Sequence, residues 1–167
     1  MTVDLTQLLL AARDGTPARD RLFAAAYPEL RKLARAQLRR HANGSTLHTT
    51  ALVHEAYLKL FDQTQLAAGD RVQFFGIAAR AMRQILVDHY RRASALKRGG
   101  GAEHLDLDDQ QIPAMVRGDL LLALDAALGR LEEMSPRLAQ VVEGRFFGGM
   151  TEDEIAQLLG VTDRTVR

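Results

Sequence analysis

An amphipathic segment from Phe74 to Arg98 constrains the fold of this chain most strongly. At about 100° per residue, its apolar side chains and one histidine share one side of a helix. They are Phe74, Ala78, Ala81, Met82, Ile85, His89 and Leu96, while Arg80, Arg83, Arg91 and Arg98 lie opposite. Because the segment has six Arg or Lys and one acid, Asp88, we expect its exposed face to meet a negatively charged partner such as nucleic acid. The alternative is a solvated surface helix that is basic by chance.

Helical periodicity also dominates the rest of the chain, and strand-like alternation is hard to find, so we predict an all-α protein. A first helix runs through Leu5 to Ala12 and ends in the turn at 14–17. A second helix follows, in which Pro28 is expected to mark a break or a new start. Further helices are predicted at about 50–61, in the basic segment after a polar loop at 62–73, and from 119 onward. Within this last part, Ser135 is expected to cap a new helix that has Pro136 at its first position.

Charge is unevenly distributed, although the formal net charge is only +1. Residues 1–102 hold 16 Lys and Arg against 8 Asp and Glu, whereas residues 118–167 hold 5 against 9. The stretch at 99–117 opens with three glycines and is then acidic, with little to bury. We therefore expect two small helical domains, 1–98 and 118–167, joined by a flexible linker at 99–117.

The composition excludes several classes of protein. Cysteine is absent, which rules out disulfides and thiolate metal sites. The apolar run at 8–12 is too short for a signal-peptide core, and no stretch approaches the ~20 apolar residues of a membrane span. The sequence therefore predicts a cytoplasmic protein.

The last 17 residues have the pattern of a helix-turn-helix. Thr151 and Glu154 form a capping box, and Gly160 supplies the turn. Ala156, four residues before Gly160, and Val166, six residues after it, suit two helices that cross closely. An ordinary helical hairpin is the alternative interpretation.

The second helix of this motif is the one that would read DNA. Thr162 is expected to cap it, and the given sequence stops at Arg167, so we expect a recognition helix that is truncated. Its candidate base or phosphate contacts are Arg164, Thr165 and Arg167.

Taken together, the two halves resemble the extracytoplasmic-function (ECF) subfamily of bacterial sigma factors. The most specific segments are LVHEAYLKLF at 52–61, ILVDHYRR at 85–92 and the final 17 residues, and the similarity covers nearly the whole chain. The resemblance implies a protein that binds core RNA polymerase, recognises promoter DNA and promotes transcription initiation. It implies neither an enzyme nor a cofactor.

The resemblance also implies roles for particular residues. Residues 1–98 would bind polymerase and the minus-ten element, and 118–167 would read the minus-thirty-five element. The helix with Leu52, Val53, Glu55 and Tyr57 would dock on the β′ clamp helices, the β subunit being a further partner. The loop at 62–73 would hold a flipped-out base. The minus-ten contacts would come from Arg80, Arg83, His89, Arg91, Arg92, Lys97 and Arg98.

One departure from the family concerns charge. Family members usually place several acids just before the polymerase-binding LV pair, where this chain has His48, Thr49, Thr50 and Ala51. We hypothesise that a Ser/Thr kinase, in place of an anti-sigma factor, phosphorylates Thr49 or Thr50, since each phosphate adds about −1.5 to −2 charge and is favourable at a helix start. The alternative is that Thr50 is simply an N-cap.

Two other classes of function compete with this interpretation. A polymerase-independent helix-turn-helix regulator is the alternative, but the most basic helix lies outside the helix-turn-helix half, which suits contacts to single strands as well. A metal site or an enzyme is disfavoured, because His54-Glu55 lacks a second histidine at metal-binding spacing and the three glycines lack the Lys-Ser/Thr of a phosphate loop. We expect a monomer when the protein is free.

The acids of the linker suggest a form of regulation. Glu103, Asp106, Asp108 and Asp109 could fold back on Arg80 and Arg91 in the free protein and screen the DNA surface. Alternatively, these acids mimic nucleic acid inside the polymerase or simply keep the linker solvated, and the last interpretation is favoured.

Overall fold

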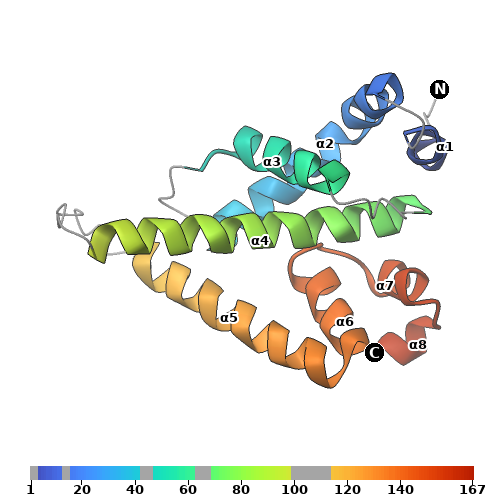
Figure 1. Cartoon of the computed structure of the whole chain (residues 1–167). Coiled ribbons are helices and arrows are strands. Elements are labelled where there is room, and N and C mark those ends of the chain that lie inside the picture. Colours follow the sequence, from blue (N-terminus) through green and yellow to red (C-terminus); the bar gives the residue numbers. More distant parts are fainter. Residues whose placement is uncertain (1–3, 13–15, 42–46, 63–68, 99–113) are drawn as a thin grey trace.

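The computed structural model of the chain describes residues 4–12, 16–41, 47–62, 69–98 and 114–167 (Figure 1). These residues form helices and short connections and contain no strand, which confirms the all-α prediction. The helices are α1 (Leu5–Ala11), α2 (Thr16–His41), α3 (Thr49–Asp62), α4 (Arg71–Arg98), α5 (Ala114–Met134), α6 (Pro136–Phe146), α7 (Glu152–Leu159) and α8 (Asp163–Val166).

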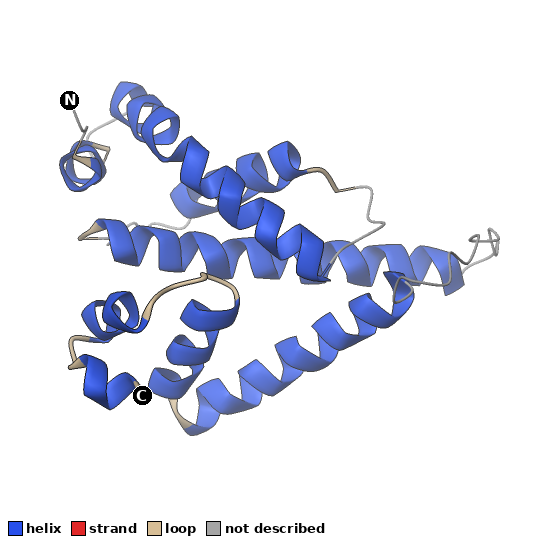
Figure 2. Cartoon of the chain, turned by 180° about the vertical axis from the view of Figure 1, so that it is seen from behind, coloured by secondary structure: helices blue, strands red, loops and turns tan. Residues whose placement is uncertain are grey.

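The basic segment forms α4, which runs through the middle of the molecule. Helices α1, α2 and α3 lie on one side of it, and α5, α6 and α7 lie on the other (Figure 1, Figure 2). One buried apolar cluster includes Leu22 of α2, Leu52 of α3, Phe74 and Met82 of α4, and Leu121 of α5. Elements of both halves of the chain therefore pack against α4.

Helix α2 continues through Pro28, so the predicted interruption at this residue is wrong. Proline has no N–H, so the carbonyl of Ala24 loses its usual donor four residues later. On either side of the proline, however, Ala26 and Leu30 are buried in the core. Burial of these flanking residues holds the helix together across the missing bond, and Pro28 itself faces solvent.

Two predicted boundaries differ from the structure. Helix α4 begins at Arg71, so residues 71–73 of the predicted loop are helical; the Asp70 carboxylate accepts a bond from the Gln73 N–H at 2.9 Å, which caps this start. Helix α5 begins at Ala114, so 114–117, the end of the predicted linker, are helical as well. The turn residues 14 and 15, most of the predicted base-holding loop (63–68) and the linker acids (within 99–113) lie outside the described residues.

The predicted cap between the last two long helices is confirmed. Ser135 accepts a hydrogen bond from the Leu138 N–H at 3.4 Å, and Pro136 is the first residue of α6. None of the helices in the described part of the chain has the length and apolar character needed to span a lipid bilayer.

Candidate nucleic-acid and polymerase interfaces

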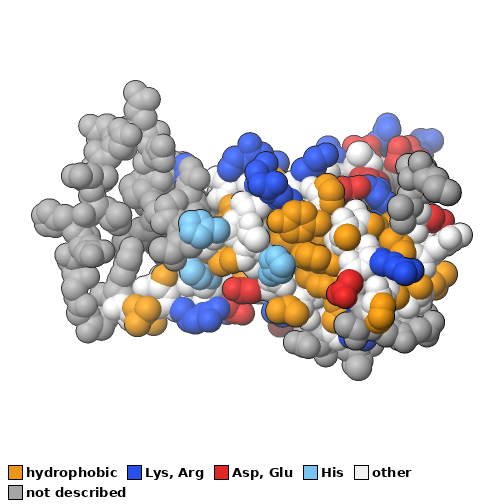
Figure 3. Space-filling view, turned by 90° about the horizontal axis from the view of Figure 1, so that it is seen from above, with side chains coloured by type: hydrophobic (Ala, Val, Ile, Leu, Met, Phe, Trp, Pro, Cys, Tyr) orange, Lys and Arg blue, Asp and Glu red, His pale blue; other side chains and the backbone are white. Residues whose placement is uncertain are grey.

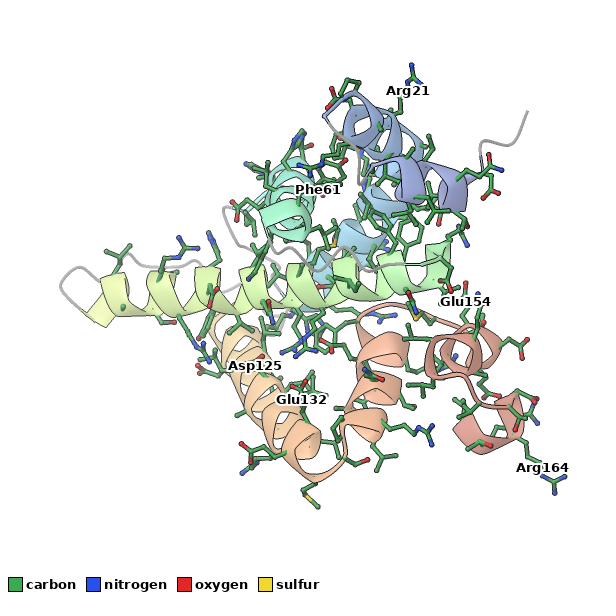
Figure 4. The ribbon with its side chains drawn as sticks, turned by 45° about the vertical axis from the view of Figure 1, so that its right-hand side comes forward. Arg21, Phe61, Asp125, Glu132, Glu154 and Arg164 are labelled. Atoms are coloured by element: carbon green, nitrogen blue, oxygen red, sulfur yellow. The ribbon has the colours of Figure 1, made fainter. Side chains whose placement is uncertain are left out.

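The basic side of α4 faces the second half of the chain. Arg80 donates to Glu132 from Nη2 at 2.9 Å, and its Nε lies 4.0 Å from Glu143. Arg91 lies 3.4 Å from Asp125. Figure 4 labels Asp125 and Glu132 on α5, the helix that packs beside α4. The surface that the sequence predicts to be exposed is thus paired with acids of α5 and α6.

Arg83 is the arginine most deeply enclosed by these acids, with only 6% of the residue exposed. Its Nε donates to Glu143 at 2.8 Å, its Nη1 donates to Asp125, and its guanidinium carbon lies 5.6 Å from the centre of the Phe147 ring. The prediction that Arg83 is solvent-exposed is wrong, because helical periodicity places a side chain on a face but does not say which partner covers that face.

The C-terminal part of α4 is more open. His89, predicted on the apolar side, is half-buried, and Arg91 and Arg92 are exposed; the Nε of Arg92 donates to the Asp88 carbonyl at 3.3 Å. Leu96, also predicted on the apolar side, is 78% exposed, because α4 extends here beyond the helices that pack on it (Figure 1). The side chains of Lys97 and Arg98 lie outside the described part.

The two candidate phosphorylation sites are the first residues of α3. The Leu52 N–H donates to the His48 carbonyl at 3.0 Å, so His48 holds the cap position and Thr50 is the second helical residue. The interpretation of Thr50 as an N-cap is therefore wrong. Thr50 is exposed and Thr49 is half-buried.

The candidate polymerase-binding residues divide between core and surface. Leu52 and Val53 are buried, Tyr57 is half-buried, and Glu55 is exposed. Leu58, which the sequence reasoning did not select, is 64% exposed on the same helix. At about 100° per residue, Leu58 falls almost opposite the buried residues Leu52 and Leu60, so the helical periodicity of α3 could have predicted its exposure.

An aromatic group fixes α3 against α2. The Tyr57 ring lies 4.4 Å from the Phe23 ring and 4.5 Å from the Phe61 ring, measured between centroids, and Figure 4 labels Phe61. The Tyr57 hydroxyl donates to the carbonyl of Arg19. The pKa of Tyr57 is raised above its usual value of 10.0, mainly because the side chain is partly buried. The hydroxyl therefore stays protonated and remains a donor at physiological pH.

Helices α7 and α8 form the predicted helix-turn-helix. Thr151 accepts from the Glu154 N–H at 3.2 Å while Glu154 accepts from the Thr151 N–H at 2.9 Å, which confirms the capping box. Gly160 has φ +63°, the left-handed conformation that glycine tolerates best. Ala156 is buried where the helices approach.

Two of the three candidate DNA contacts, Arg164 and Thr165, lie in α8, and the third, Arg167, directly follows it. Arg167 donates to Glu152 at 2.8 Å, and Thr165 shares a 3.0 Å hydrogen bond between hydroxyls with Thr162. Thr162 takes the predicted cap position, although its side chain caps no backbone N–H. Arg164 is exposed and points away from the molecule (Figure 4).

The exposed side chains of Arg31, Lys32, Arg35, Arg39 and Arg40 form a second basic surface on α2, and a cavity lies beside this helix. Figure 3, seen from the side of α2 and α3, shows Lys and Arg side chains along one edge of this face with apolar side chains beside them. A cavity of about 470 Å³ lies between α2, α4 and the connection from α6 to α7, with Gln37 and Arg40 in its lining. Within the described residues, no three His, Cys, Asp or Glu side chains cluster as metal ligands would.

An arginine-rich helix at the centre and a helix-turn-helix arrangement beyond it are features that many all-α DNA-binding proteins share. The family model described as ECF sigma factor matches residues 2–167 of the chain, which is essentially its whole length. The chain therefore belongs to the ECF sigma factor family. No match was found among curated proteins or among solved structures.

Proposed function

We propose that this sigma factor uses α3 to dock on core RNA polymerase, α4 to contact the minus-ten element and α8 to contact the minus-thirty-five element. The role in transcription initiation, with core polymerase and promoter DNA as partners, follows from family membership, and sigma factors are transcription factors rather than enzymes. The family match over the whole chain is the observation that supports this role in transcription initiation. We place the protein in the cytoplasm, where bacterial transcription takes place.

The two halves of the chain, 1–98 and 118–167, would contact different promoter elements. On α4, the proposed contacts to melted DNA come from Arg80, Arg83, His89, Arg91, Arg92, Lys97 and Arg98. On α8, the proposed contacts come from Arg164, Thr165 and Arg167. Proteins bind single-stranded DNA through basic surfaces that follow its backbone. The row of arginines on α4 could form such a surface.

For the polymerase contact, α3 combines buried anchors with an exposed face. Leu52 and Val53 are buried and fix the position of the helix, while Glu55 and Leu58 are exposed for a partner, and Tyr57 holds α3 to α2. Glu55 is the one acidic side chain on the exposed surface of the first two turns of α3. A basic partner surface therefore meets little negative charge here.

Phosphorylation of Thr49 or Thr50 would supply that charge. As the first two residues of α3, both lie where the helix has free backbone N–H groups and a positive end of its dipole. Thr50 is exposed and open to a Ser/Thr kinase. We propose that such a kinase, rather than an anti-sigma factor, controls this protein, and that the protein is a monomer when free.

Transcript profiling in bacterial cells that express the chain tests both parts. We expect the Thr49→Ala, Thr50→Ala protein to lose most of the induced transcripts when the cognate kinase is present, whereas Thr6→Ala on α1 keeps them. A double-alanine protein with full activity would remove the switch and leave the sigma role. If no form induces transcripts or binds polymerase, a polymerase-independent regulator becomes the better account.

A further inference from the structure

We propose that acids of α5 and α6 form a latch that keeps the DNA-contacting side of α4 covered in the free protein, and that the latch opens before DNA binds. The latch consists of Asp125 and Glu132 of α5 and Glu143 of α6, with Arg80, Arg83 and Arg91 of α4 as their partners. The inference rests on the proposed assignment of α4 as a promoter-contacting surface.

Charge complementarity is the first reason. All three arginines proposed for the centre of the α4 surface meet a carboxylate of the second half: Arg80 meets Glu132 at 2.9 Å, Arg83 meets Glu143 at 2.8 Å, and Arg91 lies within 3.4 Å of Asp125. Arginine binds carboxylate and phosphate with the same planar group of donors. The acids of α5 and α6 therefore occupy the positions that phosphates of DNA would take.

Occlusion is the second reason. Arg83 is held between two carboxylates and against Phe147, and only 8% of its side chain is exposed. A DNA strand has no access to this guanidinium while α5 and α6 remain in place. Arg83 therefore has no way to contact DNA in the arrangement seen here.

The contact surface between the two halves of the chain has features that would let the halves separate. Gln37 of α2 donates to the Phe147 carbonyl at 3.1 Å, but its Oε1, like the Nε2 of His41, is buried without a partner in the described part of the chain. Buried polar atoms without partners regain hydrogen bonds when water enters. Buried ion pairs also add little net stability, because their attraction is offset by lost hydration.

The acids seen next to the α4 arginines belong to α5 and α6, which the sequence analysis did not select. Glu103, Asp106, Asp108 and Asp109 lie outside the described residues, whereas Arg80 and Arg91 already have partners on α5 and α6. The latch is thus built into the folded second half, so the movement of that half as a unit uncovers α4.

Removal of two latch charges tests the proposal in the full chain. In Asp125→Asn, Glu143→Gln the side chains keep hydrogen-bond acceptors for Arg83 but lose their charge. The control, Glu133→Gln, Asp153→Asn, removes equal charge from two exposed acids of the second half that form no ion pair within the described residues. We measure binding of short, labelled single-stranded DNA of mixed sequence by fluorescence anisotropy.

The distance between the halves is measured in parallel. Because the chain has no cysteine, spin labels at Ala24→Cys on α2 and Arg137→Cys on α6, both exposed, report it without background. We expect the latch variant to show longer distances and to bind DNA at least about tenfold more tightly than the wild type, since the apparent Kd falls as the open fraction rises. The control variant should match the wild type in distance.

The outcomes separate the latch from the proposed function. An equal gain in DNA affinity in the control variant would assign the effect to net charge and overturn the latch. Unchanged distances and affinity would also overturn it, while the sigma role, measured by polymerase binding, would stand. Longer distances without a gain in affinity would overturn the masking and remove α4 from the proposed DNA surface.

A second variant covers a failure of the first to fold. If circular dichroism shows that the latch variant has lost its helices, Glu132→Gln is compared with Glu133→Gln. The Glu132 side chain is 47% exposed, so its replacement leaves the core intact. A smaller gain in DNA affinity for Glu132→Gln alone supports the latch, and equal affinities overturn it.

Discussion

His41, the last residue of α2, stacks on Phe147, the residue that follows α6, with ring centroids 5.1 Å apart and ring planes 29° apart. The contact joins the two halves of the chain. The Nε2 of His41 is buried without a partner in the described part of the chain. Burial first, and then the charge of Arg40, lowers the pKa of His41 from its usual 6.5, so the fold favours the neutral ring.

From this pKa shift we predict that the protein loses stability in acid. Because the folded-state pKa lies below the unfolded-state value, the unfolded chain binds more protons as pH falls through about 6.5. The contribution of His41 to the free energy of unfolding is complete above that pH and decreases below it. Urea unfolding between about pH 5 and 8 measures the effect.

Two variants isolate the histidine. His41→Phe keeps the ring contact with Phe147 but cannot titrate, so it should flatten the pH dependence relative to the wild type. His48→Gln removes an exposed histidine and should leave the dependence in place. A His41→Phe protein with the pH dependence of the wild type would show that the loss in acid arises elsewhere.

The two glycines within α5 are predicted to respond in opposite ways to alanine. A Cβ on Gly129 would meet no atom within 4 Å, whereas a Cβ on Gly118 would lie 1.7 Å from Cε2 of Tyr90. Alanine is favoured in a helix by about 0.8–1.0 kcal/mol. We expect Gly129→Ala to stabilise by up to that amount and Gly118→Ala to destabilise by about 1–3 kcal/mol, because the Tyr90 ring must move and lose its packing and its 2.8 Å hydrogen bond to Asp119. Equal stabilisation of both variants, measured by urea unfolding, would contradict this close packing.

The caps of the helix-turn-helix also form a matched pair. Thr151 makes a full capping box with Glu154, whereas the side chain of Thr162 caps no backbone N–H. Thr151→Ala should cost about 0.5–2 kcal/mol and Thr162→Ala less. Thermal unfolding followed by circular dichroism measures both, and a larger loss for Thr162→Ala would mean that the α8 cap is misassigned.

The prolines provide a test of helix continuity. Pro28 lies inside α2, where a missing N–H and ring crowding are unfavourable, and Pro136 is the first residue of α6, where neither matters. We expect Pro28→Ala to raise the free energy of unfolding by about 1–3 kcal/mol and Pro136→Ala to leave it unchanged or slightly lower. Loss of stability in Pro28→Ala would indicate that a bend at this residue is needed.

Local features of the fold were predictable because they depend on neighbouring residues. Ser135-Pro136, the Thr151 capping box and the turn at Gly160 follow from side chains within a few residues, and each is confirmed. Pro28 was mispredicted because burial of Ala26 and Leu30 is a tertiary effect that outweighs a local preference.

The cover on the candidate DNA surface was not predictable from the sequence. The spacing of Arg80, Arg83 and Arg91 places them on one side of α4, but Asp125 and Glu143, which pair with Arg83, come 42 and 60 residues later. Nothing in a local pattern links residues so far apart. The exposed Leu58, in contrast, was predictable, because it lies off the apolar face that Leu52, Ala56 and Leu60 form on α3.

Association with core RNA polymerase tests the central claim most directly. The chain is mixed with purified core enzyme and passed over a size-exclusion column, unmodified, phosphorylated at Thr49 or Thr50, and as Thr49→Glu, Thr50→Glu. The sigma assignment predicts that the chain elutes with the polymerase, and the charge switch predicts that the phosphorylated form does so at lower concentration than the unmodified form. Elution of every form apart from the polymerase would contradict the assignment.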